Sequence, residues 1–354
     1  MRRTLAYRSR MPAHRQRGVA IVMALLVVTL SALLVAGLLW RQQVQIRRVE
    51  NQRLMAQAQW VARGATDWTR LVIRSEGDTS PVTYLGGVWS VPIAETRLSD
   101  FLGKIGEARA EQGASTWLSG SIEDAQSRFN LRDLVTSPAP GAIQVDPAAL
   151  LTLKNLLVSL SLSSELAPRI ADQMRSSLLN SAARFATATR GGTVAPANGG
   201  RFTDDPGLAA ADDLVARPLQ LETLDALLDV PGVTPEVLAR LAPFVTILPV
   251  PTPININTAT AEVIAAAQPG MTLSAAQGLV SSRDQIFFLN LGDPRFARFL
   301  PPGGTLDVGV FDVTSRFFIV HGHIRHERAE VYRTSLIYRD NIRHSTRIVS
   351  VLDE

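Results

Sequence analysis

A run of 22 residues from Val19 to Trp40 carries no formal charge, and it constrains this chain more than any other feature. As a helix, the run is about 33 Å long at ~1.5 Å per residue, which matches a bilayer core of about 30 Å. A buried helix of a soluble protein and a cleaved signal peptide are the alternatives. The run exceeds the roughly 7 to 15 apolar residues of a signal peptide. We therefore expect a transmembrane helix over residues 19–40.

The charges on either side of the run predict its orientation. Six arginines and no acidic residue precede it, whereas three arginines follow it closely: Arg2, Arg3, Arg8, Arg10, Arg15 and Arg17 before, and Arg41, Arg47 and Arg48 after. Positive charge stays preferentially in the cytoplasm. The charges therefore predict a single span with a cytoplasmic N-terminus and the bulk of the chain outside the cytoplasm.

The apolar helix continues beyond the membrane as an amphipathic stem over residues 41–76. Leu38 to Arg63 contains neither proline nor glycine, and Gly77 and Pro81 then end the pattern. Apolar residues recur at spacings of four and three, as on one face of a helix. These residues are Leu54, Ala58, Val61, Ala65, Trp68 and Val72.

The junction Arg17-Gly18-Val19 with the apolar helix resembles the processing site of type IV pilins and of the pseudopilins of type II secretion systems. The resemblance implies that a prepilin peptidase cuts between Gly18 and Val19 and methylates the new N-terminus. Translation could start at Met1 or at Met11, and the latter gives a leader of a more usual length.

Three further features resemble the K-type minor pseudopilins. Met23 stands at the fifth mature position, where most pseudopilins have glutamate. The segment 121–134 contains Asp124, Gln126, Phe129, Asn130 and Leu131, and the run Asn255-Ile256-Asn257-Thr258 follows later. An ionised carboxylate in hydrocarbon is costly unless it is paired, and a subunit at a filament tip has no neighbour above it to pair with. Met23 therefore fits a tip position.

The resemblance implies a role and a set of partners. The chain would be a minor pseudopilin that initiates and caps the periplasmic pseudopilus, which drives protein export across the outer membrane. The implied partners are the I-type and J-type minor pseudopilins, other pseudopilins, the inner-membrane assembly platform and the prepilin peptidase. The resemblance also implies that the chain lies in the inner membrane with its bulk in the periplasm, and that the six apolar stem residues from Leu54 to Val72 contact the helices of partner pseudopilins.

The expected fold class is α+β, with a membrane helix and stem packed on a small antiparallel sheet and a large all-α insertion. Residues 312–324, 330–338 and 345–352 are rich in β-branched and aromatic residues and predict strands, and residues 84–93 are expected to join them. Dense aliphatic residues at 148–161 and 164–179 predict helices. The expected division is a leader (1–18), a membrane helix (19–40), the stem (41–76), a first pilin-like part (77–134), the insertion (135–300) and the final strands (301–354).

The insertion contains an internal repeat, which raises a second functional hypothesis. Residues 224–234 align with residues 262–272, and each copy predicts a helix, a Pro-Gly hairpin and a second helix, with Asn257 or Thr258 as the N-cap of the later copy. Such units resemble helix-hairpin-helix modules, so the alternative is a membrane-anchored DNA receptor of a DNA-uptake system. Residues 204–284 hold three arginines and ten acidic residues. A surface of that charge repels a polyanion, and we expect no nucleic acid partner.

Residues that could carry chemistry are few. His321, His323 and His326 lack the carboxylate spacing of a metal site, so we expect no metal there. The acidic group Asp204, Asp205, Asp212 and Asp213 is the candidate for calcium, but it lacks EF-hand spacing. The chain has no cysteine and no nucleophile elbow or phosphate loop. We expect no enzyme activity and no obligatory cofactor.

Overall fold

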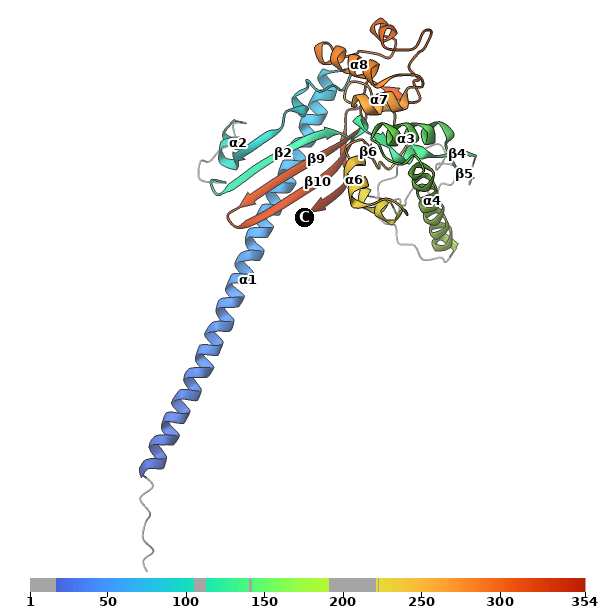
Figure 1. Ribbon diagram of the computed structural model, residues 1–354. Helices are drawn as coiled ribbons and strands as arrows, with labels where there is room; N and C mark the ends of the chain where they lie inside the picture. The colour runs from blue at the N-terminus through green and yellow to red at the C-terminus, as the bar shows by residue number, and fades with distance from the viewer. Residues whose placement is uncertain (1–16, 105–112, 140–141, 191–220, 222, 354) are drawn as a thin grey trace, which may run out of the picture.

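The computed structural model describes residues 17–104, 113–139, 142–190, 221 and 223–353. Its longest element is the helix α1 (Arg17–Thr79), which contains the predicted membrane helix and stem without a break. In the described part of the chain, α1 is the one helix long and apolar enough to cross a membrane. Its apolar N-terminal portion projects free of the rest of the fold (Figure 1).

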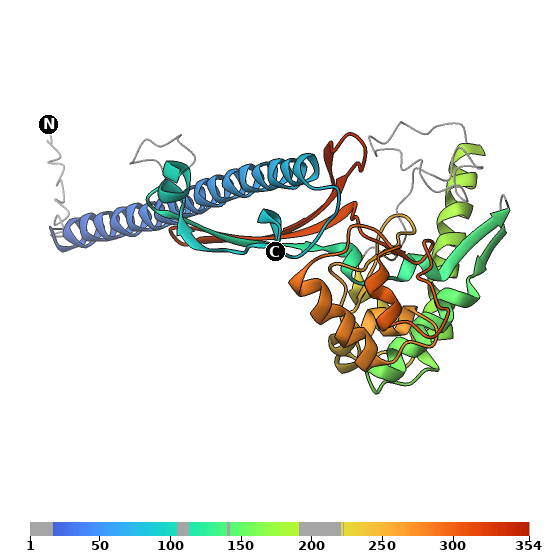
Figure 2. The same cartoon turned by 90° about the horizontal axis from the view of Figure 1, so that it is seen from above.

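The C-terminal portion of α1 lies across one face of a five-stranded antiparallel sheet (Figure 2). The strand order is β1-β2-β9-β10-β11. The bounds are β1 Ile93–Arg97, β2 Thr116–Asp124, β9 Phe317–His326, β10 Ala329–Arg339 and β11 Thr346–Asp353. Leu54, Ala58 and Ala62 of the helix are buried against Ile324 and Val331 of the sheet. Small side chains on this helix face let the helix approach the sheet closely.

The three C-terminal strands lie close to their predicted positions, but the fourth prediction was wrong. Residues 84–93 do not form a strand: they contain the short 3-10 helix η1 (Val88–Ser90), and only Ile93 belongs to β1. The strand beside β9 is instead β2, which pairs with β9 over nine positions. Two short helices, α2 (Leu98–Lys104) and η2 (Ala125–Ser127), lie next to these strands in the chain.

The helical part lies beside the end of α1 that points away from the apolar segment (Figure 1). Its elements are η3 (Leu131–Leu134), α3 (Pro147–Ser159), α4 (Leu166–Arg190), η5 (Leu224–Asp229), α6 (Pro235–Leu241), α7 (Ala261–Ala267), α8 (Leu273–Gln285) and η6 (Pro294–Arg298). They share one apolar core, which includes Leu131, Leu153, Ile170, Leu241 and Ile264. This core is separate from the apolar clusters beneath α1.

The expectation of an all-α insertion is corrected by three short strand pairs. β4 (Val135–Ala139) pairs with β5 (Ala142–Val145) inside the helical part. The other two pairs, both parallel, join β3 (Phe129–Asn130) to β6 (Val245–Thr246) and β7 (Ile254–Asn255) to β8 (Phe311–Asp312). Parallel pairs need a long crossover connection, so these two pairs hold together segments that are far apart in the sequence.

The two repeat copies have helices on both sides of their Pro-Gly turns. Gly232 and Gly270 adopt positive φ angles of 95° and 77°, which favour glycine. Thr234 and Thr272 each accept a hydrogen bond from the backbone N–H three residues later, as N-caps do. The predicted N-cap of α7 was wrong, because α7 is preceded by Thr260, whereas Asn257 bonds to Phe288.

Gly64 lies in the middle of α1, and replacing it with alanine is expected to stabilise the protein. A Cβ added to Gly64 has no other atom within 4 Å, and alanine in a helix interior is favoured over glycine by about 0.5–1 kcal/mol. The free energy of unfolding of Gly64→Ala in detergent, followed by circular dichroism, should rise by about that amount. Gly87→Ala should be destabilising, because its Cβ would lie 2.4 Å from the Glu76 carboxylate. An unchanged stability of Gly64→Ala would contradict the solvent-facing position of Gly64.

Candidate functional site

The predicted processing site lies at the start of α1. Gly18 and Val19 belong to the first turn of the helix, but their side chains lie outside what the structure describes, and so do residues 1–16 of the predicted leader 1–18. Cleavage between Gly18 and Val19 stays a prediction. Met23 lies on the apolar segment and is 60% exposed. The candidate calcium ligands Asp204, Asp205, Asp212 and Asp213 also lie outside the described residues.

The six stem residues predicted to contact partner helices fall into two groups. Leu54 and Ala58 are buried against the sheet of this chain, and Ala58 has no exposed surface at all. These two therefore offer little or nothing to a partner in this conformation. The other four, Val61, Ala65, Trp68 and Val72, line a hollow beside the stem. Contact with a partner stays a prediction for these four.

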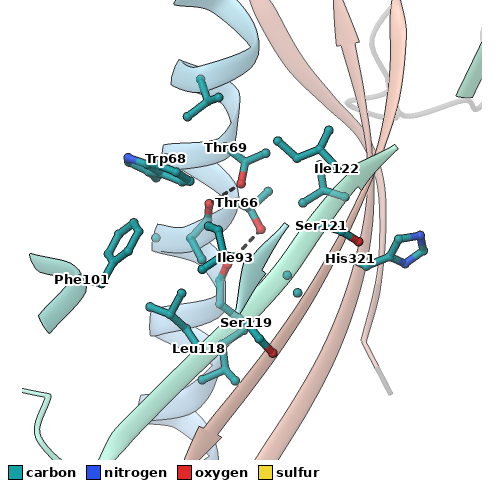
Figure 3. Close-up of a pocket in the computed structure, with 18 of the residues that line it drawn as sticks. Thr66, Trp68, Thr69, Ile93, Phe101, Leu118, Ser119, Ser121, Ile122 and His321 are labelled. Carbon is teal, nitrogen blue, oxygen red and sulfur yellow. Dashed lines mark hydrogen bonds between the residues drawn. The ribbon is translucent and has the colours of Figure 1, made fainter. Parts of the chain in front are cut away.

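The hollow is bounded by α1, α2, η1 and the strands β1, β2 and β9, and its volume is about 330 Å³. Figure 3 shows Trp68 and Phe101 facing each other from α1 and α2, with ring centroids 5.0 Å apart in an edge-on arrangement. Gly120 and Gly322 are opposite each other on β2 and β9 and leave this part of the sheet without side chains. Unfilled apolar volume is unfavourable, because its lining atoms lose packing partners.

Few polar groups face the hollow. The hydroxyls of Thr66 and Thr69 donate to the backbone oxygens of Ala62 and Ala65 within the helix (Figure 3). Arg333 is the one arginine among the described lining residues, and it donates to both carboxylate oxygens of Asp353 at 2.6 Å. The hollow is therefore suited to an apolar group.

A buried polar junction joins the sheet, the stem and the helical part. Its centre is Asp124 at the end of β2, which is 3% exposed. One carboxylate oxygen accepts hydrogen bonds from Thr258 (2.5 Å), Ser315 (2.6 Å) and Asn255 (3.0 Å). Burial raises the pKa of Asp124, against the opposing effect of these donors. The three donors come from two segments, one with Asn255 and Thr258 and the other with Ser315, which are more than 50 residues apart in the sequence.

Asn255 and Arg339 connect the junction to the surrounding backbone. The Asn255 amide donates to the oxygen of Thr83 and to Ser315 as well as to Asp124. Arg339 donates to the oxygens of Ile73 on the stem and Ser315, and burial lowers its pKa while the nearby carboxylates of Asp124 and Glu76 oppose that shift. A buried charge needs such partners to be tolerated.

A second buried polar group is centred on Asn130, which belongs to β3, the strand that follows β2 in the chain. The side chain of Asn130 donates to the oxygen of Val250 and to the Thr252 hydroxyl, and its own oxygen accepts from the N–H groups of Arg132 and Leu248. Asn130 is therefore fully satisfied. It holds the segment that follows β6 against the start of the helical part.

Both polar groups are built from the residues that carried the resemblance. The residues Asp124, Gln126, Asn130, Asn255, Asn257 and Thr258 are all buried. Because the run Asn255-Ile256-Asn257-Thr258 is buried, it cannot contact a nucleic acid in this conformation. The sequence located these positions, but it did not indicate that they meet each other.

The three histidines all lie on β9 and make separate contacts. His321 lies 3.7 Å from Glu123, His323 stacks on Tyr332, and His326 lies 3.1 Å from Gln57 of the stem. No group of three metal-ligating side chains occurs among the residues that the structure describes. The expectation of no zinc site here stays a prediction.

Comparisons with known proteins identify the family. Two family models, both described as "Type II secretion system (T2SS), protein K", match residues 127–250 and 254–297. The chain is 29% identical to type II secretion system protein K of Pseudomonas aeruginosa over 86% of this chain and 83% of that protein. This chain belongs to the protein K family of type II secretion systems. It is a minor pseudopilin.

More distant relatives agree with this assignment. Protein K of Pectobacterium carotovorum is 25% identical over 92% of this chain and 93% of its own length. The fold is similar to a chain in the crystal structure of the GspK-GspI-GspJ complex from enterotoxigenic Escherichia coli, with a TM-score of 0.55 and 16% identity over 87% of this chain and 99% of that one. These matches name protein K, and nothing in them favours the DNA receptor.

Removing the Asn255 side chain should destabilise the protein strongly. Asn255→Ala leaves the Asp124 carboxylate, the Thr83 oxygen and the Asn257 N–H without this partner. An unsatisfied buried polar group costs about 1–3 kcal/mol, and more when it is charged. We expect the free energy of unfolding to fall by about 3 kcal/mol in urea titrations. Asn290→Ala, at an exposed asparagine whose side-chain oxygen accepts a hydrogen bond from the Gly292 N–H, is the control and should change it by less than ~0.5 kcal/mol. Equal effects of the two variants would contradict the junction.

Asp133 should make stability depend on pH. Burial raises the pKa of Asp133 to about 8, above the unfolded value of about 3.9. The folded state therefore holds a proton that the unfolded state loses, so this stabilisation is complete below pH ~4 and falls as the pH rises to about 8. The free energy of unfolding should fall by less than the limit of ~1.4 kcal/mol per pH unit, because the Asp133 side chain keeps some solvent contact. Asp133→Asn should flatten urea-unfolding free energies across this range, and an unchanged slope would contradict the shift.

Proposed function

We propose that this chain initiates and caps the tip of a periplasmic pseudopilus together with the I-type and J-type minor pseudopilins. The observation that carries the proposal is the likeness to protein K over most of the chain. The similar fold of a chain in the GspK-GspI-GspJ complex supports these two partners. The other partners are other pseudopilins and the inner-membrane assembly platform.

The position of the helical part supports placement at the tip. It lies beside the end of α1 that points away from the apolar segment (Figure 1). A helical filament grows only if each subunit leaves both of its faces free for the next. A bulky part at that end blocks the position above. Met23 is consistent with this placement, because a tip subunit has no N-terminal amine above it to neutralise.

The proposal includes the orientation and the domain division. The N-terminus lies in the cytoplasm, α1 crosses the inner membrane once, and the bulk is periplasmic. The divisions are those predicted from the sequence: 1–18, 19–40, 41–76, 77–134, 135–300 and 301–354. Within the insertion, the two copies around Gly232 and Gly270 act as helix-hairpin-helix-like packing units, and their apolar side chains belong to the shared core.

Processing by a prepilin peptidase tests the proposal. When the full chain is expressed with the peptidase, mass spectrometry should find a mature N-terminus at methylated Val19. Gly18→Leu should keep the leader. Gly37→Leu is the matched control, because it makes the same change in the same apolar helix at a site with no atom within 4 Å, and it should be processed normally. An intact N-terminus or a cut near Ala36 in the unmutated chain would overturn the proposal.

A further inference from the structure

The hollow beside the stem is long and narrow. Its lining on α1 runs from Val61 to Val72, which is about 17 Å of helix at ~1.5 Å per residue. Spread over that length, its volume of about 330 Å³ gives a mean cross-section of roughly 20 Å². Apolar heavy atoms pack about 3.5–4.0 Å apart, so a slot of this cross-section holds one hydrocarbon chain but not two. No apolar side chain is long enough to fill it.

The hollow stays open at positions where a larger residue would fit. A Cβ on Gly64 would meet no atom within 4 Å, and a Cβ on Gly322 would have its nearest neighbours at 3.7 and 3.8 Å, which is ordinary contact. Gly120 differs, because its Cβ would lie 2.5 Å from the backbone oxygen of His321. An empty apolar space lowers stability, and a ligand that fills it stabilises the folded state.

The lining suits hydrocarbon better than water. The polar residues that β2 and β9 contribute, Ser119, Ser121 and His321, alternate with residues that face the hollow, and Figure 3 shows their side chains directed to the other side of the sheet. Arg333 already donates to Asp353. A buried water needs about two to four polar partners, whereas dry apolar cavities bind apolar ligands. The polar end of an amphiphile therefore stays outside the hollow, in water.

The position of the hollow along α1 selects among amphiphiles. Val61 lies 21 residues beyond Trp40, the last residue of the uncharged run, which is about 31 Å along the helix. A two-chain lipid cannot reach so far and stay in the bilayer. A single acyl chain is held in a membrane only marginally and reversibly, so it can transfer. Val88 and Val91 belong to the lining and are 73% and 67% exposed, and they form an apolar entrance from the water.

We propose that the hollow binds a single-chain amphiphile, whose hydrocarbon chain lies along α1 from Val61 to Val72 and whose polar end stays in water beside Val88 and Val91. An extended chain advances roughly 1.2 Å per bond, so the hollow takes a chain of about 12–14 carbons. This site goes beyond the proposed function and does not rest on it.

Photolabelling of the full chain in lipid nanodiscs tests the site. The probe is dodecanoate that carries a diazirine near the end of its chain, and peptide mass spectrometry locates the adducts. We expect adducts within residues 88–102, which line the hollow opposite α1, and the adducts within residues 19–40 serve as an internal reference. Unlabelled dodecanoate should compete at residues 88–102 at least tenfold better than octanoate, because each additional buried CH₂ lowers the Kd about fourfold.

Two variants fill the hollow from opposite walls. Ala65→Leu acts from the stem, and Gly322→Val acts from β9. Each should lower the labelling of residues 88–102 at least tenfold, leave that of residues 19–40 unchanged and keep or raise the melting temperature. Ala148→Leu, at an exposed helical alanine of α3, is the matched control and should be labelled like the unmutated chain.

Labelling confined to residues 19–40 of the unmutated chain would overturn the inference, and so would equal competition by octanoate and dodecanoate. The nanodisc supplies two-chain lipid in excess, so a hollow that prefers such a lipid gives the first of these results. If neither filled variant folds, the competition by chain length decides on the unmutated chain alone. The proposed function is tested separately, by processing at Val19.

Discussion

The carboxylate of Asp124 is the interaction on which the arrangement of the whole fold depends. It lies in a dry site at the end of β2, where an isolated charge would be strongly unfavourable. Its hydrogen-bond donors come from the two stretches that flank the end of the helical part, Asn255 with Thr258 and Ser315. The carboxylate is satisfied only when β2 and both of these stretches are in place, so the assembly of the sheet and of the helical part is coupled.

The sequence predicted the parts of the fold whose signal is local. The uncharged run and the stem needed only composition and periodicity, and the C-terminal strands are rich in β-branched residues. β2 was missed because its sequence, TWLSGSIED, has serines on one face and Gly120 on the other. Its place depends on pairing with β9, including Gly120 opposite Gly322, and no local pattern reports such a pairing.

The residues of the candidate site could be identified from the sequence, but the contacts between them could not. The motif residues were recognised, but their burial in one network depends on segments that approach only in the folded chain. The periodicity revealed the apolar face of the stem that this chain covers with its own sheet and that lines the hollow. Periodicity identifies an apolar face but not what packs on it.

The unbroken course of α1 has a mechanical consequence. One helix of 63 residues begins at the predicted processing site and ends beneath the sheet. Its stretch from Leu38 to Arg63 contains neither proline nor glycine that would kink it. The apolar segment and the head are thus two ends of one stiff rod. A displacement of the head along the rod axis withdraws the apolar end from the bilayer by the same distance. Work done on the head is therefore transmitted along α1 to its apolar end.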